Sequence, residues 1–144
     1  MTPLNNREFA ALTAQLMDHE GLRLKPYTDT TGHLTIGVGR NLSDIGITRG
    51  EALDMLETDI ERAIGQLFLR WPWAEHLDAV RQRVLIDMVF NLGADGVGRF
   101  PRMLAAARAG DYASAAAEML ASKWAAQVGQ RAIRLARMMR TGEA

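Results

Sequence analysis

The chain has 144 residues, of which 48% are apolar and 24% charged, with 17 basic and 17 acidic side chains and no cysteine. This length and composition are typical of one globular domain that buries a core by packing alone. The absence of cysteine excludes disulfides, thiolate metal sites and a cysteine nucleophile.

Charge and apolar patterning limit the partners of the chain. No basic cluster is strong enough to indicate a nucleic-acid partner. No run approaches the ~18 continuous apolar residues that a membrane span needs, so stable membrane insertion is not expected. The N-terminus has no basic segment before its first apolar stretch and no evident cleavage site, which predicts a cytosolic product without an export signal.

Apolar residues at helical spacing predict a first helix over residues 6–20, with Asn5 or Asn6 as its cap. Gly21 is a favoured residue just past a helix C-terminus and should end this helix. The apolar positions that define the spacing are Phe9, Leu12, Leu16 and Met17.

Residues 22–47 are expected to form a small β-containing lobe. Leu34, Ile36 and Val38 alternate with Thr35 and two glycines, as in a strand with one buried face. The pattern predicts that the apolar face is buried and that Thr35 lies on an open opposite face with almost no other side chains. A flat ligand such as a sugar ring could lie on that open face.

Helices are expected for the rest of the chain. A helix over residues 49–67 begins with a Thr48–Glu51 capping box and, at ~1.5 Å per residue, is long enough to connect two lobes. A helical lobe follows over residues 70–144, in which one strong helix starts after Asp78 and stops at Gly93. The three tryptophans are expected to pack in its core. The predicted fold class is α+β, mainly α, with residues 1–144 forming a single domain.

Two carboxylates near the start of the chain have different environments. Glu20 lies in the last turn of the first helix, against the helix dipole, where partial burial would favour its protonated form. Asp29 lies in a polar turn beside three threonines and should stay ionised. Two carboxylates whose environments push their pKa values apart can serve as an acid and a base, the pattern of glycosidic-bond cleavage. Thr35 could hold a water between itself and Asp29.

The same residues also have a purely structural interpretation. A Glu at a helix end is often solvated or paired with an Arg, an Asp is common in turns, and Gly-x-Gly often means flexible backbone. Spacing alone leaves the choice between these interpretations open.

The stretch EGLRLKPYTDTTGHLTIGVGR (residues 20–40) resembles the phage-type lysozymes, the T4-like endolysin family of muramidases. The family signature has a Glu, an Asp nine residues later and a Thr six residues beyond that, and Glu20, Asp29 and Thr35 match it. Two further blocks, LDAVRQRVLIDMVFNLG (77–93) and SKWAAQVGQRAIRLARMMRTG (122–142), are similar to helices of the family's C-terminal lobe. Together the three blocks cover most of the chain, and the resemblance implies the two-lobed lysozyme fold.

The resemblance implies hydrolysis of the β-1,4 bond between N-acetylmuramic acid and N-acetylglucosamine in bacterial peptidoglycan. Glu20 would protonate the departing sugar oxygen, while Asp29 and Thr35 would activate a water on the opposite face and invert the anomeric carbon. Inversion predicts carboxyl groups roughly 6.5–9.5 Å apart. The protein is then expected to be a monomeric phage endolysin that needs no metal or organic cofactor and waits in the host cytoplasm until a membrane pore releases it.

The resemblance also places Asn41, Phe90 and Asn91 at the substrate cleft, although the family has Gln where this chain has Asn91 and a different residue where it has Asn41. The structural alternatives are Phe90 as a core residue and Asn91 as a helix C-cap. Arg131 matches an Arg that pairs with the catalytic acid across the cleft.

Some charged residues are expected to be structural. Arg40 and Asp59 should form a bridge between the β-lobe and the connecting helix, worth at most about 1 kcal/mol if it is exposed. His33 and His76 are expected to be surface or turn residues rather than ligands.

Two other activities are compatible with parts of this pattern. A lytic transglycosylase would act on the same bond with a catalytic Glu alone, and the matches at Asp29 and Thr35 favour hydrolysis over it. A non-catalytic wall-binding module is the second alternative, and the intact acid, base and threonine are evidence against it.

Overall fold

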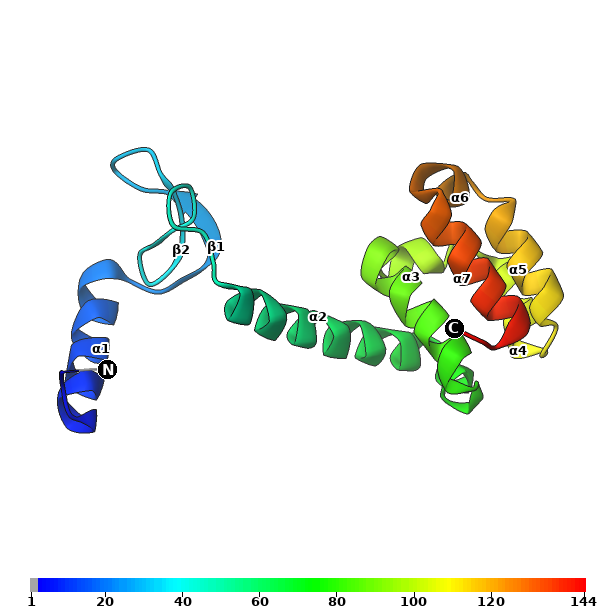
Figure 1. Cartoon of the computed structure of the whole chain (residues 1–144), viewed down its shortest axis with the longest axis horizontal. Helices are drawn as coiled ribbons and strands as arrows, with labels where there is room; N and C mark the ends of the chain where they lie inside the picture. Colours follow the sequence, from blue (N-terminus) through cyan, green and yellow to red (C-terminus); the bar gives the residue numbers. More distant parts are fainter. Residues whose placement is uncertain (1–2) are drawn as a thin grey trace. The chain divides into compact units, whose positions relative to one another are not determined.

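A computed structural model describes residues 3–144 as a mainly helical α+β fold, which confirms the predicted fold class (Figure 1). The chain forms two compact units, Met1–Leu53 and Asp54–Ala144. The expectation that residues 1–144 act as a single domain stays a prediction. Among residues 3–144, no helix combines the length and apolar content required to cross a bilayer.

The first unit begins with helix α1 (Asn6–Glu20), whose ends are those expected from its caps. The side chain of Asn5 accepts a hydrogen bond from the backbone N–H of Glu8 at 2.9 Å. At the other end, Gly21 has a φ of 76° and donates its N–H to the carbonyl of Met17. Every described residue of α1 is exposed, including its apolar stripe.

Three short antiparallel strands follow, in the order β1 (Arg23–Thr28), β2 (Leu34–Gly37) and β3 (Arg40–Asn41). The central strand β2 places Thr35 opposite Tyr27 on one side and opposite Asn41 on the other. The β1–β2 pairing is irregular between Arg23 and Tyr27. This sheet carries Thr35, and the turn before β2 carries Asp29.

The predicted orientation of β2 was wrong. Thr35 is 3% exposed and is the one buried polar residue in the described part of the chain, whereas Leu34 is 47% exposed. Alternation along the strand holds, but the apolar face is the open one. Thr35 can be buried because it lies at the centre of the sheet and its hydroxyl is satisfied by the carbonyl of His33 at 3.0 Å.

Helix α2 (Arg49–Arg70) begins with the predicted capping box. The Glu51 N–H donates to the Thr48 hydroxyl at 3.1 Å, and the Thr48 N–H donates to the Glu51 carboxylate at 2.9 Å. The helix continues to Arg70, beyond the predicted end at residue 67. The backbone N–H of the next residue, Trp71, still donates to the carbonyl of Leu67.

The second unit contains the rest of α2 and a series of short helices, which are η1 (Pro72–His76), α3 (Ala79–Val97), α4 (Pro101–Arg108), α5 (Tyr112–Leu120), α6 (Lys123–Val128) and α7 (Gln130–Thr141). Asp78 caps α3 as predicted, accepting from the Arg81 N–H at 3.1 Å. Gly93 leaves the helical conformation, with φ 75° and ψ 165°, yet the helix resumes to Val97. Gly93 therefore ends the helix that starts after Asp78, as predicted, and a second short helical segment follows it within α3.

The hydrophobic core lies in this second unit, and every buried apolar residue of the described chain falls between Ala63 and Met139. Trp124 is buried in this core while Trp71 and Trp73 pack partly buried against it, which confirms the packing predicted for the tryptophans. Small alanines and flexible methionines make up much of the core. Its buried methionines are Met88, Met103, Met119, Met138 and Met139.

Arg81 connects the start of α3 to the end of α7. Its Nε donates to the carbonyl of Met139 at 2.6 Å and its Nη2 to the carbonyl of Arg140 at 3.0 Å. The guanidinium also lies 3.5 Å from the centre of the Tyr112 ring. The last carbonyl groups of a helix have no partner within the helix, and the Arg81 guanidinium donates to two of them. Arg81 therefore stabilises the end of α7 and its packing against Tyr112.

Candidate active site

Glu20 is the last residue of α1, as expected, and its carboxylate lies beside Gly39 in the turn between β2 and β3. Gly39 in that turn has a φ of 65°, and a Cβ placed on it would lie 2.9 Å from Oε2 of Glu20. The absence of a side chain at position 39 therefore leaves the space that the carboxylate occupies.

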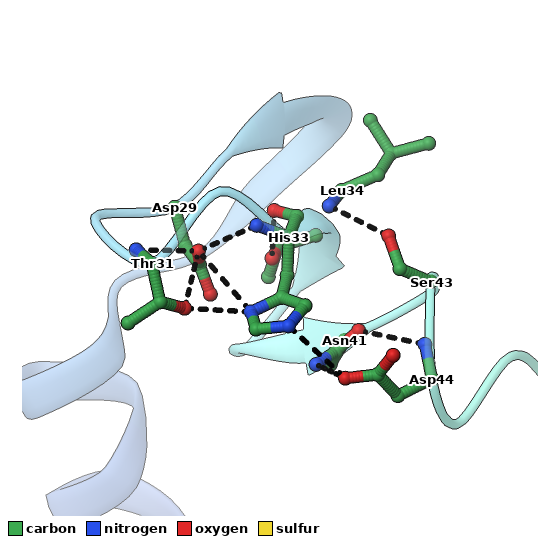
Figure 2. Close-up of polar contacts among 8 residues, drawn as sticks. Asp29, Thr31, His33, Leu34, Asn41, Ser43 and Asp44 are labelled. Carbon is green, nitrogen blue, oxygen red and sulfur yellow. Dashed lines mark hydrogen bonds and ion pairs between the residues drawn. The ribbon is translucent and has the colours of Figure 1, made fainter.

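Asp29 directly follows β1 and begins the turn that leads into β2. Its Oδ1 accepts three hydrogen bonds: from the Thr31 N–H at 2.9 Å, the Thr31 hydroxyl at 2.8 Å and the His33 N–H at 2.8 Å (Figure 2). Among residues 3–144, no donor is paired with its other oxygen, Oδ2. One oxygen is thus fixed by the protein and the other is available to a ligand.

The donors around Asp29 stabilise its charged form. The backbone N–H of His33 has the largest effect, followed by the hydroxyl of Thr31, and together they hold the pKa of Asp29 below its ordinary value. This agrees with the expectation that Asp29 is ionised near neutral pH, as a general base must be.

Asp29 and Thr35 are linked through a single peptide group. The carbonyl of His33 accepts the Asp29 N–H at 2.9 Å and the Thr35 hydroxyl at 3.0 Å. The N–H of His33 in turn donates to the Asp29 carboxylate. The backbone of His33 therefore fixes Asp29 and Thr35 relative to each other.

The side chain of His33, expected only to occupy a surface or turn position, joins this network as well. Its Nδ1 lies 2.6 Å from the Thr31 hydroxyl and 3.7 Å from Oδ1 of Asp29, and its Nε2 lies 3.1 Å from Oδ2 of Asp44. The i, i+2, i+4 spacing of residues 29, 31 and 33 within a turn is a signal that could have revealed part of this cluster. Asp44 lies beyond the next strand, and no local pattern connects it to His33.

Asn41 helps to hold Asp44 in place. Its side-chain Nδ2 donates to Oδ2 of Asp44 at 3.1 Å, and its Oδ1 accepts the Asp44 N–H at 3.0 Å. The site in the first unit thus brings together three of the predicted residues, Asp29, Thr35 and Asn41, with Glu20 at the neighbouring turn. A substrate contact by Asn41 stays a prediction.

Phe90 and Arg131 line a groove of about 880 Å³ in the second unit. Phe90 is 46% exposed, so it is not a core residue. Arg131 pairs with Asp87, with its Nη2 2.7 Å and its Nε 2.9 Å from Oδ1. The pairing of Arg131 with the acid Glu20 and a substrate contact by Phe90 stay predictions.

Asn91 has a structural partner in the second unit. Its Oδ1 accepts the indole N–H of Trp124 at 2.8 Å, which connects α3 to α6. The residue that leaves the helical conformation is Gly93, two positions further on, so Asn91 is not the helix C-cap. Its predicted role in substrate binding is untested.

Arg40 and Asp59 lie in different units and each has a partner within its own unit, while the expected bridge between them stays a prediction. Arg40 donates to the Glu51 carboxylate at 2.9 Å and to the Gly46 carbonyl at 3.2 Å, and Asp59 accepts from Arg62 at 3.1 Å. Glu51 lies at the first turn of α2, closer along the chain to Arg40 than Asp59 is, so less backbone must be ordered to form the pair.

Comparison with known proteins gives consistent results. The family model described as phage lysozyme matches residues 17–140. The chain is 30% identical to the pre-baseplate central spike protein Gp5 of Enterobacteria phage T4, over 97% of this chain but 29% of that protein. It is 27% identical to the probable T4-type lysozyme 2 of Dictyostelium discoideum, over 92% of this chain and 95% of that protein. It is also 27% identical to the probable T4-type lysozyme 1 of the same organism, over 85% of this chain and 89% of that protein.

Proposed function

The chain belongs to the phage lysozyme family of T4-type muramidases, which hydrolyse peptidoglycan, and we propose that it cleaves the glycan with Glu20 as acid and Asp29 as base. The bond broken is the β-1,4 link between N-acetylmuramic acid and N-acetylglucosamine. The reaction is a single displacement in which water replaces the departing sugar and the anomeric carbon inverts.

Glu20 supplies the proton that the leaving group needs. As the glycosidic C–O bond breaks, the departing oxygen takes the carboxyl proton of Glu20, and Glu20 becomes a carboxylate. The position beside Gly39 supports this role, because the missing side chain there leaves room for the Glu20 carboxylate at the β2–β3 turn.

Asp29 and Thr35 orient the attacking water. The Thr35 hydroxyl donates its own proton to the His33 carbonyl, so toward a water it can only accept. The Asp29 carboxylate also accepts from the water. Its Oδ1 already has three donors, so Oδ2 is the oxygen left for the water. A water that donates to both is left with a lone pair for the anomeric carbon, and the proton it loses on attack goes to Asp29.

The burial of Thr35 refines this role. With 3% of the residue exposed, Thr35 is too covered to support a sugar ring, but its hydroxyl can meet one small molecule. The observation that carries the proposal is the shared His33 peptide, which couples the base to the threonine through hydrogen bonds of 2.8–3.0 Å.

The first test compares Glu20→Gln with the parent in a turbidity assay on outer-membrane-permeabilised cells. Loss of the proton donor is expected to reduce the rate by roughly 10²–10⁴-fold. Asp18→Asn, an exposed acid on the same helix, is the control and should keep the parental rate. Equal rates for Glu20→Gln and the parent would refute the role given to Glu20.

The products separate hydrolysis from transglycosylation. Mass spectrometry of the released fragments should find ordinary reducing ends, because a water has been added across the bond. Ends of the 1,6-anhydro type would identify a lytic transglycosylase instead.

We also propose that the protein acts as an endolysin, which accumulates in the host cytoplasm and reaches the wall through a membrane pore. The second candidate role is that of a lysozyme domain in a virion spike, which the similarity to the spike protein Gp5 favours. Mass spectrometry of purified virions distinguishes the two roles. An endolysin should be absent from the particles and free in the lysate, whereas its peptides within the particles would identify a spike component.

A further inference from the structure

We propose that Arg23, stacked on Tyr27 on the sheet face of Thr35, binds a carboxylate that the muramic acid of the substrate carries on its O3 side chain. The inference rests on the proposed function, because it names the group by which the same site recognises its glycan. Neither Arg23 nor Tyr27 is among the catalytic candidates.

The strand register places Arg23, Tyr27 and Thr35 on one face of the sheet. Tyr27 is directly opposite Thr35, and Arg23 is directly opposite Gly37. Directly paired residues of antiparallel strands point to the same face, and so do residues two positions apart on one strand, such as Thr35 and Gly37. The cation and the aromatic ring therefore share a face with the threonine proposed to orient the attacking water.

An irregularity in β1 brings Arg23 and Tyr27 together. The two residues are four positions apart in β1, but their partners Gly37 and Thr35 are two positions apart in β2, so β1 has two extra residues here. Residues four apart in a regular strand are separated by about 13 Å. Pro26 suits the irregular segment because it has no N–H to donate to a neighbouring strand. The shortened path allows the side chain of Arg23 to reach the ring.

The contact with the ring leaves the hydrogen-bond donors of Arg23 available. Its guanidinium carbon lies 4.3 Å from the centre of the Tyr27 ring. Cation–π attraction holds a guanidinium there without using its N–H groups, which form a planar fork that matches a carboxylate. No carboxylate in the described part of the chain pairs with Arg23. The protein therefore holds the cation in place but does not neutralise it.

The surface beside this pair is open to a ligand. The side chain of Arg23 is exposed, and Tyr27 is half-buried. Gly37, the last residue of β2, has no side chain, and a Cβ placed on it would meet no atom within 4 Å. A ligand can therefore approach the guanidinium over this end of β2.

The proposed substrate carries an anionic group on the sugar that lies at this face. The water held by Asp29 and Thr35 attacks the anomeric carbon of the muramic acid, so this sugar is the one beside the two residues. Its O3 carries a lactyl ether that ends in a free carboxylate or in a stem peptide with carboxylates of its own. N-acetylglucosamine has no such group. A cation at this place therefore selects the bond that follows the muramic acid.

The test uses three forms of one glycan. These are intact peptidoglycan, peptidoglycan whose carboxylates are converted to neutral methylamides, and strands freed of peptides by an amidase, which keep the lactyl carboxylate. Release of reducing ends gives kcat and KM for the parent and for Arg23→Gln. On intact peptidoglycan, Arg23→Gln should raise KM about threefold to tenfold at unchanged kcat, as for a bidentate ion pair open to solvent. On the methylamide form, the two proteins should have the same KM.

The peptide-free strands identify the source of the carboxylate. A raised KM for Arg23→Gln on these strands would assign the contact to the lactyl carboxylate, and equal KM values would assign it to the stem peptide. Lys25→Gln is the matched control, because it removes one positive charge from another exposed position of β1. It should keep the parental KM on all three forms.

Two measurements keep the inference testable if Arg23→Gln fails to fold. Tyr27→Leu removes the ring that supports the guanidinium, and it should raise KM on intact peptidoglycan but not on the methylamide form. The unmodified protein should itself have a higher KM on the methylamide form than on intact peptidoglycan. A parental KM that methylamidation leaves unchanged would overturn the inference.

The remaining outcomes separate this inference from the proposed function. A parental KM for folded Arg23→Gln on intact peptidoglycan, or an equal rise on the methylamide form, would show that Arg23 binds no carboxylate. An equal rise in Lys25→Gln would show non-specific attraction of the wall to basic residues. Each of these results leaves the proposed hydrolysis intact. Absence of reducing ends when the parent acts on intact peptidoglycan would instead refute the hydrolysis itself.

Discussion

At the scale of single residues, Gly39 leaves the space that Glu20, the proposed acid, occupies. Any side chain there would displace the Glu20 carboxylate, since its Cβ would come within 2.9 Å of Oε2. Gly39→Ala is expected to lower kcat roughly tenfold to a hundredfold, the cost of a misplaced catalytic group. Activity is measured with the turbidity assay and stability by thermal unfolding.

Gly46→Ala is the matched control for this prediction. Gly46 has a φ of 68°, close to the 65° of Gly39, but the nearest atom to a Cβ there is 4.0 Å away. Both variants should lose roughly 1 kcal/mol of stability from the left-handed backbone. A similar loss of kcat in both would show that backbone strain, rather than the Glu20 contact, is responsible.

Sequence predicted the local position of each catalytic candidate better than its exposure. Glu20 at a helix end and Asp29 in a turn follow from caps and turn residues, which act over a few positions. The burial of Thr35 depends on its neighbours Tyr27 and Asn41 in adjacent strands, which hydrophobic alternation does not encode. The side-chain partners of His33 were missed for the same reason, because Asp44 reaches it from another loop.

At the scale of elements, the start of α2 is fixed by Glu51, which serves two purposes. Its carboxylate completes the capping box with Thr48 and accepts from Arg40 at the beginning of β3. The hydrogen bond from Arg40, followed by that from the Thr48 backbone, lowers the pKa of Glu51 from 4.5 to about 2. One side chain thus connects the sheet to the long helix.

This lowered pKa predicts how stability changes in acid. The folded state binds the Glu51 proton more weakly than the unfolded state, so the stabilisation is complete above pH 4.5 and is lost as pH falls toward about 2. Glu51→Gln should therefore have a lower Tm than the parent near neutral pH, and the difference should shrink across that acidic window. Thermal unfolding followed by circular dichroism at several pH values measures it.

Glu57→Gln provides the comparison for this pH dependence. Glu57 is an exposed acid on α2 that forms no ion pair with any residue of the described chain. Its variant should keep the parental Tm at every pH. A Glu51→Gln protein whose Tm difference stays constant from neutral pH to pH 2 would contradict the assigned pKa.

Helix starts were easier to predict than helix ends. Asn5, Thr48 and Asp78 each cap the helix that follows them, because a capping side chain bonds to an N–H only three residues away. The extension of α2 to Arg70 depends instead on packing in the core, where Leu67 is fully buried. The second helical segment of α3, after Gly93, likewise ends at the fully buried Val97.

At the scale of the whole molecule, apolar burial is unequal between the two units. No apolar side chain among residues 3–53 is buried, whereas the core extends from Ala63 to Met139. Ordering a residue costs roughly 1.5 kcal/mol of conformational entropy, which a segment without a buried core cannot offset. The fold class was predictable from hydrophobic periodicity. The unequal burial of apolar side chains was not, because the helical spacing of apolar residues in α1 is the same whether that face is buried or exposed.

The inequality predicts how fragments of the chain behave. A peptide of residues 1–53 should be largely unfolded in isolation, while a peptide of residues 54–144 should keep its helical circular dichroism and unfold cooperatively. The peptides are compared by far-ultraviolet circular dichroism during heating. A sharp unfolding transition in the 1–53 peptide would contradict the prediction.

The methionines of the core have a chemical consequence. Five of them are buried in the folded protein, where peroxide cannot reach their sulfur atoms. Once a molecule opens in an oxidising medium, conversion to the sulfoxide makes those side chains polar, and they no longer fit an apolar interior. Oxidation then keeps the opened molecule from refolding, so peroxide should increase the rate of irreversible inactivation on heating.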